Sequence, residues 1–271
     1  MNDSLGTSPE LLDYHVPEPF RAFSTMRQGG VSQGKYGAFN VNAYCGDLPE
    51  HVNANRSRLC TALGLDSSRL VMPHQTHQDR CLAIGHGFFE QPAEARARSL
   101  EGVDAIMTDL KGTCIGVSTA DCVPILLVDP DHQAVGAVHA GWRGTVLHIA
   151  GKAVRTMQDV YQTDPGHLLA IIGPSISIAN FEVGDEVVEA FATAGFPVAK
   201  VACQIVNGAG TPRWHIDLWA ANTLTLLEAG LALRHIAVSG ICSYANVASF
   251  FSARRLGIAS GRIFSGVLIQ P

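Results

Sequence analysis

One stretch of the chain, residues 118–145, limits the possible folds more than any other: STADCVPILLVDPDHQAVGAVHAGWRGT. Its two apolar runs, 123–128 and 134–138, are short and rich in β-branched residues, so they predict two buried strands rather than helices. Asp129, Pro130 and Asp131 form a strong turn signal between them. If the strands pair as an antiparallel hairpin, Cys122 and His139 lie at the same open end, where a metal site or a nucleophile pair could form.

The segment after this hairpin predicts a turn into a helix. Apolar residues recur at helical spacing from Val146 to Val160, and Thr145 is suited to be the N-cap. The start of a helix carries free backbone N–H groups and a positive dipole end, and Arg143 adds a bidentate donor just before it. We therefore expect an anion-binding position beside Cys122 and His139.

The rest of the chain predicts a mixed α/β (α+β) fold. With 271 residues, of which 47% are hydrophobic and 16% charged, the chain is long enough for one large compact domain. Strands and helices alternate without a regular βαβ order, which favours mixed β-sheets flanked by helices. We expect a single catalytic domain over residues 21–271, after a loose lead-in over residues 1–20.

Charge and cysteine content exclude several functional classes. The net charge is −5 and Lys/Arg residues do not cluster, so a nucleic-acid surface is not expected. The chain has seven cysteines without paired spacing, no signal peptide and no apolar run of about 20 residues. We expect a cytoplasmic protein that does not bind membranes, as a monomer or homodimer.

A glycine-rich segment, residues 23–47, is a second candidate for ligand binding. Its glycines could bring backbone close to a ligand, with Arg27, Ser32 and Asn40 nearby. It matches neither the P-loop nor the dinucleotide fingerprint. A glycine-rich surface hairpin therefore remains the alternative interpretation.

Two histidines, His74 and His77, precede a strand predicted at residues 81–84. They could be surface residues, but His77 together with Cys122 and His139 makes a ligand set suited to Zn²⁺, with one coordination position left open. The same residues could form a Cys–His nucleophilic pair, or a blue-copper site that lacks an axial ligand. Cys122 could also be a small core residue.

A series of longer motifs resembles the YfiH family, the laccase-domain proteins once labelled polyphenol oxidases and now regarded as purine nucleoside phosphorylases. The resemblance runs from about residue 20 to the C-terminus. It rests on TxRxGGVSxGxYxxxN (residues 25–40), QTH (75–77), GVDAIMTD, STADCVPILLVDP, AVHAGWRGT, GPSIxxxxFEVGDEV and FFSxRRxGxxSGR.

The resemblance implies a YfiH-like fold and zinc-dependent phosphorolysis of adenosine, inosine, guanosine and methylthioadenosine, with adenosine deaminase activity beside it. Purine nucleosides and phosphate would be the partners, and copper is a less favoured metal than zinc. The family's metal ligands fall on His77, Cys122 and His139. Other motif positions suggest catalytic roles for Arg27, Asn40 and Arg143, and substrate-binding roles for Ser32, Asp121, Arg254 and Arg255.

The chain departs from the expected family pattern at three places: residues 178–180, Gln78, and Ala245 with Asn246. Each of them leaves the proposed metal ligands in place, so they bear on substrate preference. Two alternative functions are a copper polyphenol oxidase and a factor that edits peptidoglycan precursors.

Overall fold

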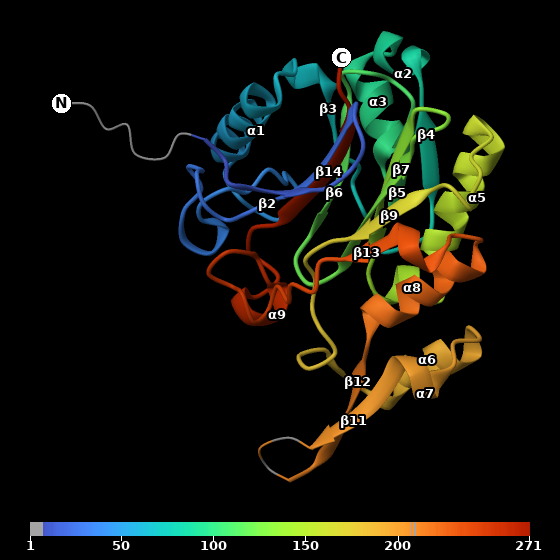
Figure 1. Cartoon of the computed structure of the whole chain (residues 1–271). Coiled ribbons are helices and arrows are strands. Elements are labelled where there is room, and N and C mark those ends of the chain that lie inside the picture. The colour runs from blue at the N-terminus through green and yellow to red at the C-terminus, as the bar shows by residue number, and fades with distance from the viewer. Residues whose placement is uncertain (1–7, 207, 209) are drawn as a thin grey trace.

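Two β-sheets packed face to face form the body of the protein in a computed structural model that describes residues 8–206, 208 and 210–271 (Figure 1). The first sheet has the order β1 (Leu11–Tyr14), β2 (Phe20–Thr25), β14 (Ile263–Ile269), β6 (Cys114–Thr119), β3 (Leu70–Val71). The second has the order β13 (Ile236–Val238), β9 (Leu169–Ile172), β7 (Val123–Asp129), β8 (Ala134–Ala140), β5 (Ala105–Thr108), β4 (Cys81–Ile84). Both sheets contain parallel and antiparallel pairs, as the sequence predicted.

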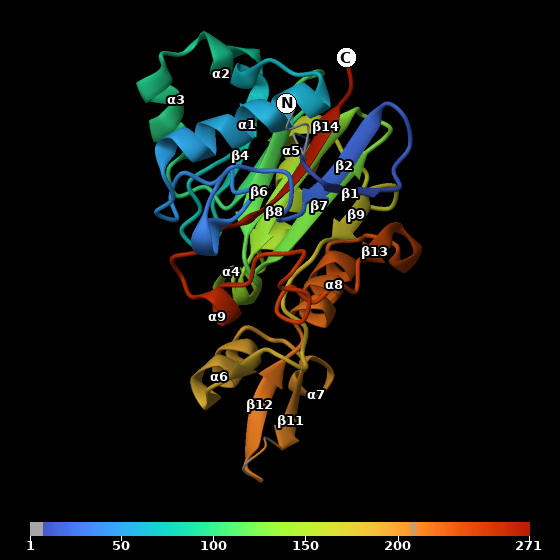
Figure 2. The same cartoon turned by 90° about the vertical axis from the view of Figure 1, so that its left-hand side faces the viewer.

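Helices cover the outer faces of the two sheets, which gives four layers (Figures 1 and 2). Helix α1 (Pro49–Leu63) lies on the five-stranded sheet; α5 (Ile149–Tyr161) and α8 (Leu218–Glu228) lie on the six-stranded one. Two shorter helices, α2 (His86–Glu90) and α3 (Ala93–Leu100), connect β4 to β5. Helix α1 ends at Gly64, whose φ of 66° is left-handed, as the sequence predicted.

Strand β7 shows why its sequence is a continuous apolar run. Successive side chains point to opposite faces of a sheet, and here both faces are covered. Leu126 and Val128 pack between the two sheets, whereas Ile125 and Leu127 pack toward α5. A strand buried on both sides needs no polar alternation, so the pattern follows from its central position.

A smaller lobe projects from this body (Figure 2). It consists of an antiparallel sheet, β10 (Glu182–Val183), β12 (Pro212–Ile216) and β11 (Ala202–Val206), with α6 (Asp185–Thr193) and α7 (Val198–Val201). Asp217 follows β12 and caps α8 by accepting a hydrogen bond from the backbone N–H of Ala220, at 2.9 Å. The sequence predicted this cap.

The structure corrects two local predictions. Thr145 is not an N-cap, because α4 (Trp142–Val146) already begins after Gly141 and a second helix, α5, begins after His148. The hydroxyl of Thr145 instead donates to the carbonyl oxygen of Gly141, at 3.0 Å. Within the described part of the lead-in, residues 8–20, β1 forms four residue pairs with β2 and is therefore ordered; residues 1–7 lie outside the described residues. None of the helices in the described part of the chain combines the length and the apolar composition of a membrane span.

Candidate metal centre

The hairpin that dominates the sequence forms as predicted. Strands β7 and β8 are antiparallel, with Val123 opposite Ala140 and Pro124 opposite His139. Cys122, one residue before β7, therefore lies beside His139 near the end of β8. The two side chains meet at the same edge of the six-stranded sheet.

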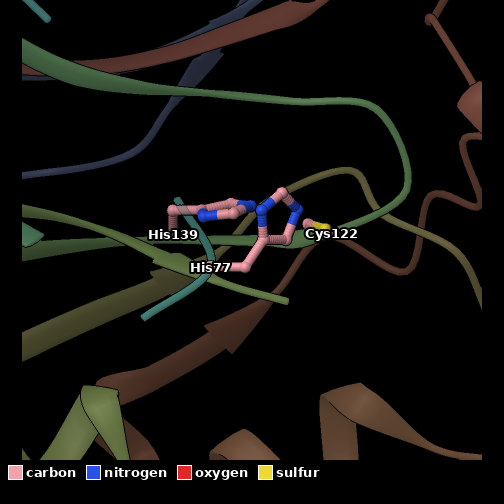
Figure 3. A group of neighbouring side chains, drawn as sticks. All are labelled: His77, Cys122 and His139. Atoms are coloured by element: carbon pink, nitrogen blue, oxygen red, sulfur yellow. The ribbon is translucent and has the colours of Figure 1, made fainter. Parts of the chain in front are cut away.

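His77 completes the group from a third segment, the loop between β3 and β4. The candidate ligand atoms of His77, Cys122 and His139 all lie within 4.8 Å of one another. The two imidazole rings are 4.8 Å apart between centroids and meet edge to face, at 80°. Figure 3 shows the three side chains gathered from their separate segments. The structure thus brings together the three residues that the sequence grouped as metal ligands.

Asp104, just before β5, holds two of these three residues in place. Its fully buried carboxylate accepts a hydrogen bond from Nδ1 of His139 at 2.7 Å. It also accepts backbone N–H bonds from Thr76, His77 and Gln78, at 3.2, 3.0 and 2.9 Å. Burial raises the pKa of the Asp104 carboxyl, but these donors outweigh burial and hold that pKa below its usual range. Asp104 is the first of two aspartates in GVDAIMTD, and no pattern in the sequence indicated this role.

These residues fit a single metal ion. Because Nδ1 of His139 is engaged with Asp104, Nε2 is the nitrogen left for a metal, and a carboxylate behind a histidine is the usual support for such a ligand. Gly141 keeps the space open: a Cβ there would lie 3.0 Å from Sγ of Cys122 and 3.3 Å from Cδ2 of His77. Two imidazoles and a thiolate suit Zn²⁺ and leave room for a further ligand.

Charge coupling between Cys122 and His139 prepares the thiol for this role. Burial raises the pKa of the Cys122 thiol, but His139 and His77 outweigh burial and bring the pKa below its usual value. Burial lowers the pKa of His139, yet the Cys122 thiolate and Asp104 raise it overall. The thiolate, which is the metal-binding and nucleophilic form, is therefore favoured even in the metal-free protein.

The three candidate ligands lie in a cavity of about 370 Å³, within the range of sites for small molecules. One wall is polar, because Gln75 pairs with the backbone of Ser118 through bonds of 2.9 and 2.8 Å. Besides the three candidate ligands, the lining residues are Asn42, Tyr44, Cys45, His74, Gln75, Ser118, Thr119, Ala120, Ala253, Ile258 and Arg262.

Thr119 carries an unexpected polar group in this lining. Its side chain is 1% exposed, and its hydroxyl has no hydrogen-bond partner within the part of the chain that the structure describes. An unpaired buried hydroxyl is costly, so it marks a position where a ligand could supply the missing bond. Nothing in the sequence distinguished Thr119 from its neighbours on β6.

The arginine that lines the cavity is not one of those predicted. Arg262 supplies the one guanidinium among the described lining residues. Arg143 is exposed, and its guanidinium lies over the ring of Trp142, 4.3 Å from the centroid. Arg255 lies over Tyr244 and donates to that residue's carbonyl oxygen at 3.2 Å. Arg254 borders a neighbouring hollow of about 400 Å³.

Arg27, Ser32 and Asn40 are not among the residues that line the cavity. The guanidinium of Arg27 donates to the carbonyl oxygens of Gly37, at 3.0 and 2.9 Å, and Val247. Ser32 and Asn40 both donate to Oδ2 of Asp47, at 2.6 and 2.9 Å. These contacts order the glycine-rich segment, so the sequence-based catalytic and substrate-binding roles of the three residues stay predictions.

Asp121 lies one residue before Cys122, at a φ of 88°. Its carboxylate accepts a bond from the hydroxyl of Ser243 and another from the backbone N–H of Arg254, both at 2.7 Å. It therefore joins the turn before β7 to the start of α9 (Ala253–Leu256). Asp121 borders the neighbouring hollow rather than the cavity with the metal ligands.

A family model described as multi-copper polyphenol oxidoreductase laccase matches residues 21–270. The chain belongs to this family. Its similarity to proteins of known structure extends over nearly the whole chain. The YfiH protein of Bacillus licheniformis superposes with a TM-score of 0.87 at 28% identity, over 97% of both chains. YlmD from Geobacillus stearothermophilus superposes with a TM-score of 0.86 at 30% identity, over 100% of this chain and 98% of that one.

Curated relatives of this family member carry enzyme names other than laccase. A protein from Bacteroides thetaiotaomicron named purine nucleoside phosphorylase is 43% identical over 92% of this chain and 91% of its own length. A protein named adenosine deaminase RL5, from an unknown prokaryotic organism, is 45% identical over 92% of this chain and 94% of its own length.

Proposed function

We propose that this protein is a zinc-dependent purine nucleoside phosphorylase of the cytoplasm, which acts on adenosine, inosine, guanosine and methylthioadenosine and deaminates adenosine as a side activity. The observation that carries the proposal is the His77, Cys122 and His139 cluster in a cavity of about 370 Å³. The names of two relatives above 40% identity support the reaction class. The described cysteines, all with free thiols, accord with a reducing compartment.

Phosphorolysis requires the cavity to bind phosphate and to stabilise the ribose as its bond to the base breaks. The bond between the anomeric carbon and the purine nitrogen breaks, and its electron pair leaves with the base, which takes up a proton. A phosphate oxygen forms the new bond to the anomeric carbon. The cavity must therefore hold a phosphate anion against a ribose that gains positive charge, and preorganised donors are the main means of doing so.

His77, Cys122 and His139 would hold the metal ion through the two imidazoles and the thiolate. When bound, zinc supplies a positive charge that polarises a coordinated oxygen. Asp104 fixes the orientation of His139 and the backbone of the His77 loop. These residues thus set the position of the ion before substrate arrives.

Arg262 is the residue we propose for binding phosphate, in place of Arg143, Arg254 and Arg255. Its guanidinium is held by the carbonyl oxygens of Ser260 at 2.6 Å and Ile258 at 2.9 Å, so its position is fixed in advance. Its backbone N–H donates to Oδ1 of Asn40 at 3.2 Å. Asn40 thereby acts as a positioning residue, which we propose instead of direct catalysis.

The test is a reaction of the purified, metal-analysed protein with inosine and phosphate. We expect hypoxanthine and ribose 1-phosphate in equal amounts, and no base release when phosphate is left out. With adenosine, phosphate should yield adenine, and inosine should form with or without it. His77→Ala and Cys122→Ala should lose both metal and activity, while the controls His167→Ala and Cys203→Ala, at exposed positions outside the cavity, should keep both. Absence of base release from a metal-loaded protein would refute the proposal.

A copper polyphenol oxidase is the second candidate because the family description names laccases. A multicopper enzyme needs several copper ions, each with its own set of ligands. Among the described residues, His77, Cys122 and His139 form the one group of three or more His, Cys, Asp or Glu side chains with metal-binding geometry. Copper in the purified protein together with oxygen uptake on phenols would favour this candidate over the phosphorylase.

A further inference from the structure

Two aromatic side chains in the cavity have no role in the chemistry described above. Tyr44 and His74 both line the cavity that contains the metal ligands. Their rings are stacked, with centroids 4.0 Å apart and planes 20° from parallel. His74 lies outside the group of metal ligands, so its position calls for another explanation.

His74 is a fixed backing for this stack. Its Nδ1 lies 2.8 and 2.9 Å from the two carboxylate oxygens of Glu101. Its backbone is held on both sides, since its N–H donates to Leu100 at 3.1 Å and its carbonyl oxygen accepts from Gly102 at 2.9 Å. Ring and backbone are thus both restrained before any ligand binds.

Tyr44 is the more exposed member of the stacked pair. It is 55% exposed, although large aromatic side chains usually bury most of their surface. His74 stacks on one face of the ring, and Tyr44 borders both the cavity with the candidate ligands and a neighbouring hollow of about 220 Å³. Ile258, which is 83% exposed, contributes a second uncovered apolar side chain to the same cavity.

We propose that the Tyr44 ring, backed by His74, is the platform on which the purine base stacks, and that it selects substrates by the flat aromatic group they carry. Every base has a π-face, and stacking on an aromatic side chain tolerates different ring substituents. The platform therefore suits an enzyme that accepts several purines. The inference rests on the proposed phosphorylase activity and assigns its base-binding side.

The proposal assigns base and phosphate to side chains of different chemistry. Tyr44 and His74 present aromatic rings, whereas Arg262 presents the guanidinium of the cavity lining. Loss of stacking should therefore weaken binding of the base without weakening binding of the sugar phosphate. Two products of the reaction, hypoxanthine and ribose 1-phosphate, probe these two parts separately.

The experiment compares Tyr44→Ala with Tyr44→Phe in inosine phosphorolysis. Tyr44→Ala should raise KM for inosine and the inhibition constant for hypoxanthine by about tenfold, the effect of losing one base–aromatic stack, and change the inhibition constant for ribose 1-phosphate less than twofold. Tyr44→Phe keeps the ring and should stay within about twofold of the parent enzyme. Leu48→Ala, 52% exposed and outside the cavity, is the matched control.

A second pair of variants distinguishes stacking from proton transfer by His74. His74→Phe retains an aromatic backing and should keep KM near that of the parent, whereas His74→Ala should raise it. If His74→Phe were as impaired as His74→Ala, the backing role would be wrong. If the parent enzyme released base and Tyr44→Ala left KM and hypoxanthine inhibition unchanged, the platform would be refuted while the phosphorylase proposal stood. A parent enzyme with metal but no base release would refute the phosphorylase itself.

Discussion

At the scale of single residues, the candidate site depends on polar groups whose partners differ in kind. Asp104 is satisfied by four protein donors, whereas the hydroxyl of Thr119 finds none among the described residues. The four donors fix the position of the Asp104 carboxylate, whereas the unpaired hydroxyl of Thr119 is suited to bind a ligand. The grouping of His77, Cys122 and His139 could be predicted from the sequence because these residue types are rare and chemically distinctive. Thr119 and Asp104 could not, because their roles depend on which neighbours the fold supplies.

Thr119→Val tests the unpaired hydroxyl. Valine has nearly the same shape, and removing a buried polar group without a partner should leave the free energy of unfolding unchanged or raise it by about 1 kcal/mol. KM for inosine should rise several-fold if the hydroxyl binds substrate. Thr163→Val is a close control, because Thr163 is also buried and unpaired among the described residues but lies outside the cavity. Equal kinetics in both variants would exclude a substrate contact at Thr119.

At the scale of elements, the sequence predicted the features that depend on neighbouring residues and missed a contact between residues far apart in the chain. The β7–β8 hairpin, α1 with its Gly64 end and the Asp217 cap of α8 were predicted correctly, because each depends on residues close in sequence. The assignment of Thr145 as an N-cap was wrong, because the helix already begins in the glycine-rich turn at Trp142. The sequence placed His77 just before a strand. It did not predict the hydrogen bond from His77 to Asp104, because the two residues are 27 positions apart and no local pattern links them.

Asp104→Asn tests this attachment of the loop. Both oxygens of Asp104 accept hydrogen bonds, and asparagine replaces one of them with an NH₂ group, which donates. The loop and His139 should therefore lose their fixed positions. We expect metal affinity to fall about 10- to 100-fold. Asp129→Asn is a matched control: Asp129 is also buried, accepts two backbone N–H bonds and pairs with His132 at the other end of the hairpin. It should lose stability without losing metal, as measured by competition with a chelator dye. Unchanged affinity in Asp104→Asn would contradict this role.

At the scale of the whole molecule, the sequence predicted a mixed α/β fold but not how its two sheets are assembled. The strand order places the last strand, β14, between β2 and β6, and β1 at the edge. Such pairings join segments more than a hundred positions apart, and periodicity within a segment carries no information about them. The cavity could not be predicted for the same reason, because its lining comes from five separate parts of the chain.

Metal removal tests the whole molecule, because one ion would tie together the β3–β4 loop, the turn before β7 and the end of β8. A ligand that binds only the folded state raises its stability, by about 4 kcal/mol at a thousandfold excess over Kd. We expect Tm to fall by several degrees after chelation and to recover with added zinc, as followed by calorimetry. Cys203→Ala should show the same shift, and Cys122→Ala should show none. A Tm independent of zinc in the parent protein would exclude this linkage.

The central position of β14 also has a consequence for synthesis on the ribosome. The strands of the six-stranded sheet are all encoded before residue 239, so that sheet can form while the chain is still growing. The other sheet must wait, because β2 and β6 pair only through residues 263–269. Arg262 emerges immediately before them. A nascent chain therefore carries two unpaired strand edges until residues 263–269 have emerged, and before that point it depends most on protection from aggregation.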